Sequence, residues 1–97
     1  MTYKTALVTG GAIRIGKDIC KKLHENGYNI ICHYNKSEDA AKALKSELNE
    51  SRKNSCEVFS LDLNNLNQVE DLLEKINKNF HSLDLLVTTL PLFLKQI

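Results

Sequence analysis

The sequence predicts an α/β domain built on a doubly wound parallel sheet. Two observations lead to this fold class. Short β-rich apolar runs alternate with longer segments in which apolar residues recur every three or four positions. The loops between these segments are short, and no linker or repeat interrupts the pattern. Such an alternation implies parallel strands that are joined by right-handed crossovers. We expect the strands in the order 3-2-1-4.

The first three elements form a strand–helix–strand unit. Residues 5–9 read T-A-L-V-T, a continuous run that is typical of a strand covered on both faces. Residues 14–26 form the predicted helix, and Gly27 follows it as a C-terminal stop. The apolar stripe of this helix repeats every four positions and consists of Ile15, Ile19 and Leu23. Residues 29–34 form the second strand, and we expect His24 at the surface.

The remaining elements continue the alternation. Ser37 is the expected N-cap of a second helix, which has two acids in its first turn. The apolar face of that helix consists of Ala40, Ala41, Leu44 and Leu48. Residues 56–61 form a third strand, and residues 84–87 begin a fourth. The strongest helical pattern lies between them, with apolar residues at Leu66, Val69, Leu72, Leu73, Ile76 and Phe80. Arg52 and Lys53 are interpreted as a solvated loop.

The composition fits one small soluble domain. The 97 residues are 42% hydrophobic and 26% charged, and thirteen basic residues nearly balance twelve acidic ones. This balance gives no electrostatic reason to expect nucleic acid or a membrane surface as a partner. No apolar run is long enough to span a bilayer, and no secretory leader is visible. Three cysteines without metal-ligand spacing are expected as small buried residues in a reducing cytoplasm.

Glycine is concentrated between the first strand and the first helix. Three of the four glycines, Gly10, Gly11 and Gly16, lie there. Such a turn needs glycine because the chain reverses tightly and its backbone must approach a ligand closely. The following helix N-terminus presents unpaired N–H groups and the positive end of a dipole, which suits a pyrophosphate. A plain turn is the alternative, but the strand before it and the helix after it favour nucleotide binding.

Two segments carry a resemblance to a known family. Residues 9–16 read T-G-G-A-I-R-I-G, which resembles the T-G-x-x-x-G-x-G turn of the short-chain dehydrogenase/reductase family. Arg14 replaces the family's middle glycine, and arginine at this place is typical of the pteridine reductases. Residues 33–37, H-Y-N-K-S, are similar to the H-Y-x-R/K-S segment of the same enzymes. The resemblance covers about residues 4–87 and implies the N-terminal part of a Rossmann-type fold.

The same resemblance implies a set of cofactor contacts. Asp62 and Leu63 follow the third strand, where members of the family contact adenine. The full set of implied cofactor-binding residues is Gly10, Arg14, Ile15, Gly16, His33, Tyr34, Asn35, Lys36, Ser37, Asp62 and Leu63.

The end of the second strand favours NADPH over NADH. Folds that prefer NAD place an acid there to bind the ribose 2′-hydroxyl, whereas the first acid here is Glu38. Arg14 and Lys36 supply cations, and Ser37 and the helix N-terminus supply donors, for a 2′-phosphate. The alternative interprets Lys36 as a solvated lysine and His33 as an ordinary strand-end histidine. Taken together, the residues favour NADPH.

The sequence departs from the family after Val87. The family's fourth strand leads into Asn-Asn-Ala, whereas residues 88–97 read T-T-L-P-L-F-L-K-Q-I, with a proline where a buried strand should end. In the family's Tyr-x-x-x-Lys pair the tyrosine donates a proton and the lysine lowers its pKa. None of the three tyrosines here has a lysine four positions later. We therefore interpret residues 1–87 as a dinucleotide-binding half-domain without catalytic residues, and residues 88–97 as an aberrant tail.

A one-base frameshift is our hypothesis for this tail. With suitable codons for residues 87–97, one adenine restored after the valine codon changes the reading to V-N-N-A-S-S-F-F-K-T-N. This is the segment expected of a pteridine reductase. The first base of most restored codons is a third base in the present frame, so it can vary without changing the present residues. The second and third bases are largely fixed by the present residues, and they fit the expected segment. Natural divergence is the alternative. The hypothesis predicts that downstream DNA encodes a serine or aspartate and Tyr-x-x-x-Lys in the shifted frame.

The resemblance also implies a reaction and partners. The full-length parent is expected to transfer a hydride from NADPH to a dihydropteridine, dihydrofolate or related pterin. The alternative is a non-catalytic nucleotide-binding or interaction fragment without reductase activity. For this chain we expect NADP(H) as ligand, the pterin only in a full-length parent, and the family's oligomer contacts to be missing.

Overall fold

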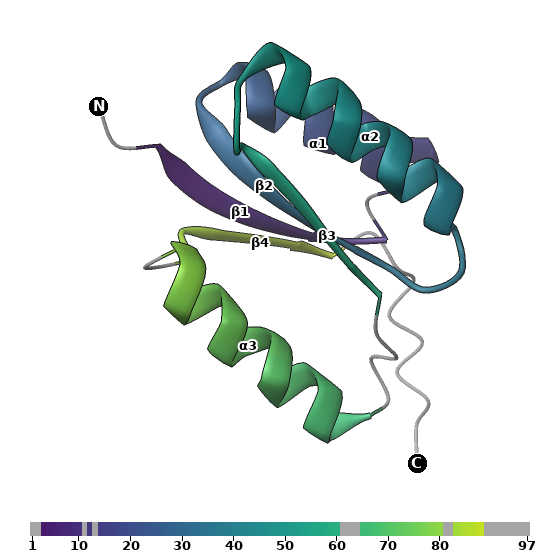
Figure 1. Cartoon of the computed structure of the whole chain (residues 1–97), viewed down its shortest axis with the longest axis vertical. Helices are drawn as coiled ribbons and strands as arrows, with labels where there is room; N and C mark the ends of the chain where they lie inside the picture. The colour runs from purple at the N-terminus through teal and green to yellow at the C-terminus, as the bar shows by residue number, and fades with distance from the viewer. Residues whose placement is uncertain (1–2, 11, 13, 61–64, 81–82, 89–97) are drawn as a thin grey trace.

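In the computed structural model, four strands form one parallel sheet that has helices on both faces (Figure 1). The structure describes residues 3–10, 12, 14–60, 65–80 and 83–88. The strand order is β3-β2-β1-β4, which confirms the expected order and the α/β fold class.

The elements follow one another as the sequence predicts, with small shifts at their ends. They are β1 (Lys4–Thr9), α1 (Arg14–Glu25), β2 (Tyr28–Tyr34), α2 (Glu38–Ser51), β3 (Cys56–Ser60), α3 (Leu66–Phe80) and β4 (Leu85–Thr88). Strand β1 pairs in parallel with β2 and β4, and β2 pairs in parallel with β3. The strands therefore end at one edge of the sheet, which we call the carboxyl edge. Thr9 lies there, opposite His33 on β2 and Thr88 on β4.

Helices α1 and α2 cover one face of the sheet (Figure 1). The core between these layers consists of Ala6, Val8, Ala12, Cys20, Ile30, Cys32, Ala41, Leu44, Leu48 and Cys56. The apolar face predicted for α2 is confirmed, because three of its members belong to this core and Ala40 packs against it. The three cysteines are buried and free, as expected. Burial raises the pKa of the Cys56 thiol to about 12, so this group behaves as a small apolar side chain.

Helix α1 turns a different stripe toward the sheet from the one that we expected. Ile15 is 73% exposed, so the predicted apolar stripe does not face the sheet at this position. Gly16, Cys20 and His24 form the buried stripe instead, while Ile19 and Leu23 pack beside it. Small side chains at the first two of these positions allow the helix to lie close against the strands, which a row of isoleucines would prevent.

Helix α3 covers the opposite face of the sheet (Figure 1). Leu72 and Ile76 are buried there against Leu7 and Ile31, and Val69 packs against them. Leu66 and Leu73 are exposed, so the apolar pattern of this helix is wider than the face that it buries. The side chain of Phe80 lies outside the described part of the chain.

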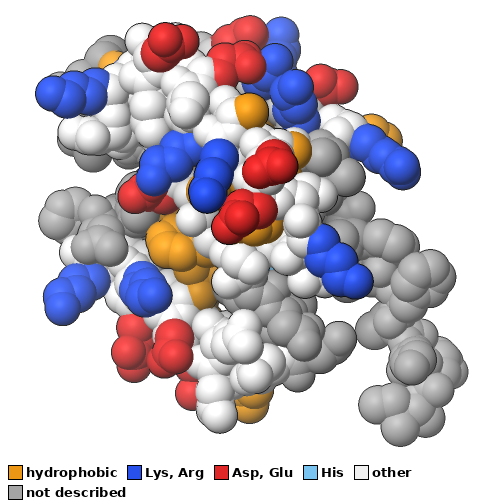
Figure 2. All heavy atoms as spheres, turned by 45° about the vertical axis from the view of Figure 1, so that its right-hand side comes forward, with side chains coloured by type: hydrophobic (Ala, Val, Ile, Leu, Met, Phe, Trp, Pro, Cys, Tyr) orange, Lys and Arg blue, Asp and Glu red, His pale blue; other side chains and the backbone are white. Residues whose placement is uncertain are grey.

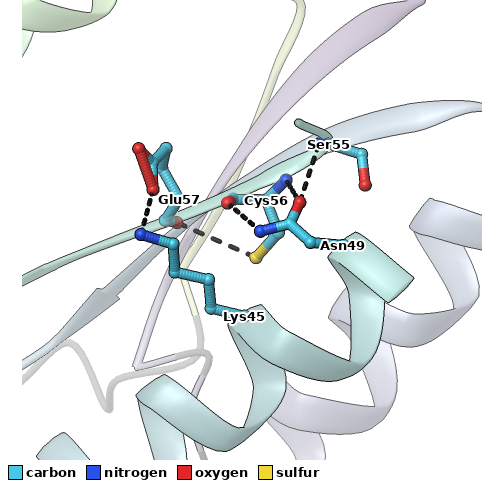
Figure 3. A network of polar contacts seen from close by, with 5 residues as sticks. All are labelled: Lys45, Asn49, Ser55, Cys56 and Glu57. Carbon is cyan, nitrogen blue, oxygen red and sulfur yellow. Dashed lines mark hydrogen bonds and ion pairs between the residues drawn. The ribbon is translucent and has the colours of Figure 1, made fainter. Parts of the chain in front are cut away.

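A polar network joins α2 to the first residues of β3 (Figure 3). The Asn49 side-chain oxygen accepts hydrogen bonds from the backbone N–H groups of Ser55 (2.8 Å) and Cys56 (2.9 Å). The amide nitrogen of Asn49 donates to the carbonyl of Cys56 (3.1 Å). Three backbone groups that precede or begin the strand are thus paired by one side chain. The neighbouring Lys45–Glu57 ion pair (2.6 Å) is partly exposed and adds little to stability.

Two side chains that we expected in solvent are part of the packing at the amino ends of the strands. The Arg52 guanidinium donates hydrogen bonds to the carbonyls of His24 (3.1 Å) and Tyr28 (2.5 Å) and lies 4.1 Å from the ring centroid of Tyr3. His24 is 4% exposed, and its Nε2 lies 2.7 Å from the hydroxyl of Ser55. The interpretation of both residues as solvated was wrong, because each pairs with buried backbone or hydroxyl groups.

Candidate functional site

The turn after β1 has backbone conformations that favour glycine at two positions. Gly10 has φ 64° and Arg14 has φ 54°. Glycine adopts this left-handed region without steric cost, whereas an L-residue pays roughly 1–2 kcal/mol there. The family pattern has glycine at the position of Arg14, and this geometry gives the physical reason. Arg14, which departs from the family pattern, therefore has a strained backbone and lies at the edge of a candidate ligand site.

The first turn of α1 presents both charge and apolar surface at the carboxyl edge. Arg14 and Ile15 are exposed, and Gly16 is buried against the sheet. The helix thus begins with two side chains in solvent above a closely packed glycine. A helix N-terminus of this kind offers N–H donors to an anion, with an apolar side chain beside them.

The residues at the end of β2 and just after it differ in exposure, since some are buried and others lie in solvent. His33 is 2% exposed, and its Nδ1 accepts a hydrogen bond from the Gly10 N–H at 3.1 Å. Tyr34 is half-buried and packs against the core beneath α1 and α2. Asn35 and Lys36 are exposed beyond the strand. Residues 35–37 therefore follow β2 at the carboxyl edge, whereas His33 lies inside the protein.

Ser37 occupies the N-cap position of α2, as predicted. Its backbone φ is −87° and its ψ is 57°, and its carbonyl accepts the Ala41 N–H at 2.9 Å. Its hydroxyl makes no capping hydrogen bond to the helix. The expected position is correct, but the side chain does not cap the start of the helix.

The charged groups near this segment leave two cations available. The first acid after β2, Glu38, has its carboxylate 3.9 Å from the Lys42 ammonium one turn along the helix. Within the described ranges, neither Arg14 nor Lys36 forms an ion pair. Because β1 and β2 are adjacent and parallel, both cations follow strands that end at the same edge.

The rest of the described surface carries charges of both signs and an open hollow. Figure 2 shows Lys and Arg side chains intermixed with Asp and Glu over the face in view. An open hollow of about 210 Å³ lies between β3 and α3, lined by Phe59, Ser60, Gln68, Asp71, Leu72 and Lys75. No described helix is long and apolar enough to cross a membrane. Among the same residues, no group of three His, Cys, Asp or Glu is placed to hold a metal ion.

Two of the predicted contacts, Asp62 and Leu63, lie outside the described residues, as do residues 89–97. Two features of the site were missed by sequence reasoning. The hydrogen bond between Gly10 and His33 joins residues that are 23 positions apart, and no sequence pattern signals it. The left-handed backbone of Arg14 had a signal, since the related turn has glycine at this place.

Comparison with known proteins supplies independent findings. The family model described as short chain dehydrogenase matches residues 4–90. Pteridine reductase 1 of Leishmania tarentolae is 42% identical over 65 residues, which are 67% of this chain and 22% of that protein. The uncharacterized oxidoreductase YmfI of Bacillus subtilis is 36% identical over 73 residues, which are 75% of this chain and 30% of that protein.

A third relative is named for a different substrate. The 3-oxoacyl-(acyl-carrier-protein) reductase FabG of Staphylococcus epidermidis is 34% identical over 86 residues, which are 87% of this chain and 34% of that protein. The chain thus spans between 22% and 34% of the length of these curated relatives.

Proposed function

The chain belongs to the short-chain dehydrogenase family, and from this premise we propose that residues 1–87 are the NADPH-binding part of a pteridine-reductase-like oxidoreductase. The reaction proposed for the full-length enzyme is hydride transfer from NADPH to a dihydropteridine, dihydrofolate or related pterin. One observation carries the choice of cofactor. The end of β2 has no acid, and two cations without ion pairs among the described residues, Arg14 and Lys36, lie at the carboxyl edge.

The residues present fit a dinucleotide with a 2′-phosphate. The Gly10 turn and the start of α1 would hold the pyrophosphate through backbone N–H groups. Arg14 and Lys36 would neutralise the 2′-phosphate, and the Ser37 hydroxyl, which does not cap the helix, would donate to it. The nicotinamide of the bound cofactor supplies the hydride. The described residues bind and orient the adenosine end.

The pterin substrate rests on local sequence as well as on family membership. The family includes a pteridine reductase and a 3-oxoacyl-(acyl-carrier-protein) reductase among the relatives of this chain, so membership alone does not choose a substrate. Arg14 in the glycine turn and the segment H-Y-N-K-S at residues 33–37 support the pteridine reductase type.

A second candidate function has its own observation. These 97 residues contain no Tyr-x-x-x-Lys pair, which the family uses to donate the proton and to hold the nicotinamide ribose. On this alternative the chain binds the nucleotide and transfers no hydride. Because neither candidate has this chain oxidise NADPH, the DNA downstream of these codons is what separates them. A serine or aspartate and Tyr-x-x-x-Lys encoded there in the shifted frame would support the enzyme, and their absence would support the non-catalytic unit.

Titration calorimetry with two probes tests the cofactor assignment. We expect 2′-phospho-ADP-ribose to bind about tenfold more tightly than ADP-ribose, because charge-assisted bonds to the phosphate contribute roughly 1.5–3 kcal/mol. Lys36→Gln should reduce this preference, whereas Lys53→Gln, which alters an exposed lysine after α2, should leave it unchanged. Equal affinities for the two probes in the unaltered chain would refute the 2′-phosphate assignment.

A further inference from the structure

The side chain of His33 joins Gly10, the first residue of the glycine turn, to β2. The Gly10 N–H donates to Nδ1 of His33 at 3.1 Å, and the imidazole is 2% exposed. Thr9, the residue before the turn, lies opposite His33 in the β1–β2 pairing. The sheet thus places this imidazole beside the first residue of the turn, on the inside of the protein.

The chemistry of imidazole determines what this contact requires. A ring nitrogen accepts a hydrogen bond only when it carries no proton, so Nδ1 is bare and the neutral ring carries its proton on Nε2. The donor is a backbone group at a residue with φ 64°, where the chain leaves the strand and turns. Without an acceptor, the Gly10 N–H would lose its partner, and glycine would have more freedom to adopt other conformations.

We propose that His33 is a positioning residue of the dinucleotide site and acts through Gly10 rather than by touching the cofactor. It fixes the path of the turn, on which close approach of the backbone to a pyrophosphate depends. This role rests on the proposed function. It differs from both roles considered for this residue in the sequence, a direct cofactor contact and an ordinary strand-end histidine.

Two variants separate the acceptor from the rest of the side chain. In His33→Asn, the side-chain oxygen is attached to Cγ as Nδ1 is, so an acceptor remains in the same place. In His33→Leu, the branch at Cγ remains and the acceptor is removed. We expect His33→Asn to bind 2′-phospho-ADP-ribose within about twofold of the unaltered chain, and His33→Leu to bind about five- to tenfold more weakly.

A readout without ligand tests the hydrogen bond itself. Amide hydrogen exchange at Gly10, followed by NMR, should be slow in the unaltered chain and in His33→Asn and at least about tenfold faster in His33→Leu. Equal exchange rates in all three would overturn the contact. If His33→Leu does not fold, His33→Gln serves instead, because it moves the acceptor one bond further away. We expect its affinity to be lower than that of His33→Asn.

The outcomes distinguish this inference from the proposed function. Absence of probe binding by the unaltered chain would overturn the proposed function and the role of His33 together. Probe binding that neither His33→Leu nor His33→Gln weakens would overturn the positioning role alone. Equal losses in His33→Asn and His33→Leu would show that the ring fills space rather than accepting the Gly10 N–H, and would also overturn it.

Discussion

Arg14 has two properties with opposite effects on the molecule. Its backbone φ of 54° is strained for a residue with a side chain, and its exposed guanidinium begins α1 at the carboxyl edge. Strain of this kind clusters at ligand sites, and glycine at this position would relieve it. The residue that departs from the family's glycine pattern is therefore a direct test of whether the site binds an anion.

Replacing Arg14 with glycine should raise stability and reduce cofactor preference at once. We expect the free energy of unfolding of Arg14→Gly to rise by up to about 1 kcal/mol, because relief of strain exceeds the entropy cost of glycine. The preference for 2′-phospho-ADP-ribose over ADP-ribose should fall. Urea unfolding and calorimetry measure the two effects. Arg14→Gln is the matched control, since it removes the charge and keeps the strain. An Arg14→Gly chain with undiminished preference would contradict the assigned role.

The surroundings of His24 favour its neutral form over its charged form. The Ser55 hydroxyl lies near the carbonyls of Leu48 (3.2 Å) and Arg52 and has one proton to donate, so His24 Nε2–H is the donor in their contact. Burial lowers the pKa of His24 below its ordinary value of 6.5, and the positive charge of Arg52 lowers it further. The unfolded chain therefore binds a proton at His24 more readily than the folded chain does.

This difference makes stability depend on pH in a defined direction. The contribution of neutral His24 is fully present above pH 6.5 and is lost as the pH falls below that value. In His24→Gln, a side-chain N–H still reaches toward Ser55 but does not titrate. We expect the unaltered chain to lose more stability than His24→Gln between about pH 7.5 and about pH 5.5, as measured by urea unfolding. Parallel losses in the two chains would contradict the neutral buried state.

At the scale of elements, Asn49 is the residue that ties α2 to β3. Its side chain pairs three backbone groups of Ser55 and Cys56 at 2.8–3.1 Å. Strand β3 lies at one side of the sheet and pairs with β2 alone among the described strands. Its first residues thus depend on this side chain for the hydrogen bonds that a second neighbouring strand would otherwise provide.

Removal of this side chain should be costly. We expect Asn49→Ala to lower the free energy of unfolding by roughly 2–4 kcal/mol, because partly buried backbone groups lose their partners. Glu50→Ala, one position along the same helix and exposed, should change it by less than about 0.5 kcal/mol. Thermal and urea unfolding of both variants provide the comparison. Similar effects in the two would show that Asn49 does not carry the α2–β3 junction.

The order of the elements could be predicted from the sequence because the spacing of apolar residues and the short loops determine it. Few other folds accommodate a run such as T-A-L-V-T that is followed by a glycine turn and by a segment with the apolar spacing of a helix. Which helical stripe faces the sheet could be predicted for α2 but not fully for α1 or α3. In α3 the apolar residues cover two overlapping stripes, and only packing shows that Leu72 and Ile76 are buried while Leu66 and Leu73 are not.

The burial of polar residues also could not be predicted from the sequence. Period-two alternation identifies the faces of a strand that has one solvated side, but β2 has buried residues on both faces. The pattern therefore does not show on which face of the sheet the His33 side chain lies. His24 was missed for a similar reason, because its partner Ser55 is 31 positions away. The site segments were identifiable from motifs, whereas the contacts that position them came from the structure.

At the scale of the whole molecule, the two faces of the sheet are covered unequally. Helices α1 and α2 pack on one face and α3 on the other (Figure 1). Leu86 lies opposite Leu7 in the β1–β4 pairing and is 56% exposed on the α3 side. Together with Leu66 and Leu73 on α3, it contributes large exposed apolar side chains. Exposed apolar side chains beside a sheet promote association between chains.

We therefore expect self-association that increases with protein concentration. The double variant Leu73→Gln/Leu86→Thr should shift the chain toward monomer in sedimentation velocity experiments, because it removes apolar surface on the α3 side. Ile15→Thr, which removes an even more exposed apolar side chain from α1, should associate as the unaltered chain does. A monodisperse monomer of the unaltered chain at all concentrations would contradict this expectation.

If the carboxyl edge beside β1 and β2 is an NADPH site, an NMR titration with 2′-phospho-ADP-ribose should change the amide shifts of residues there. We expect changes at Gly10, at the start of α1 from Arg14 to Gly16, and at Lys36 and Ser37. Residues at the opposite edge, such as Asn49, should not respond. Shifts confined to the hollow between β3 and α3, or no shifts at saturating probe, would contradict the claim.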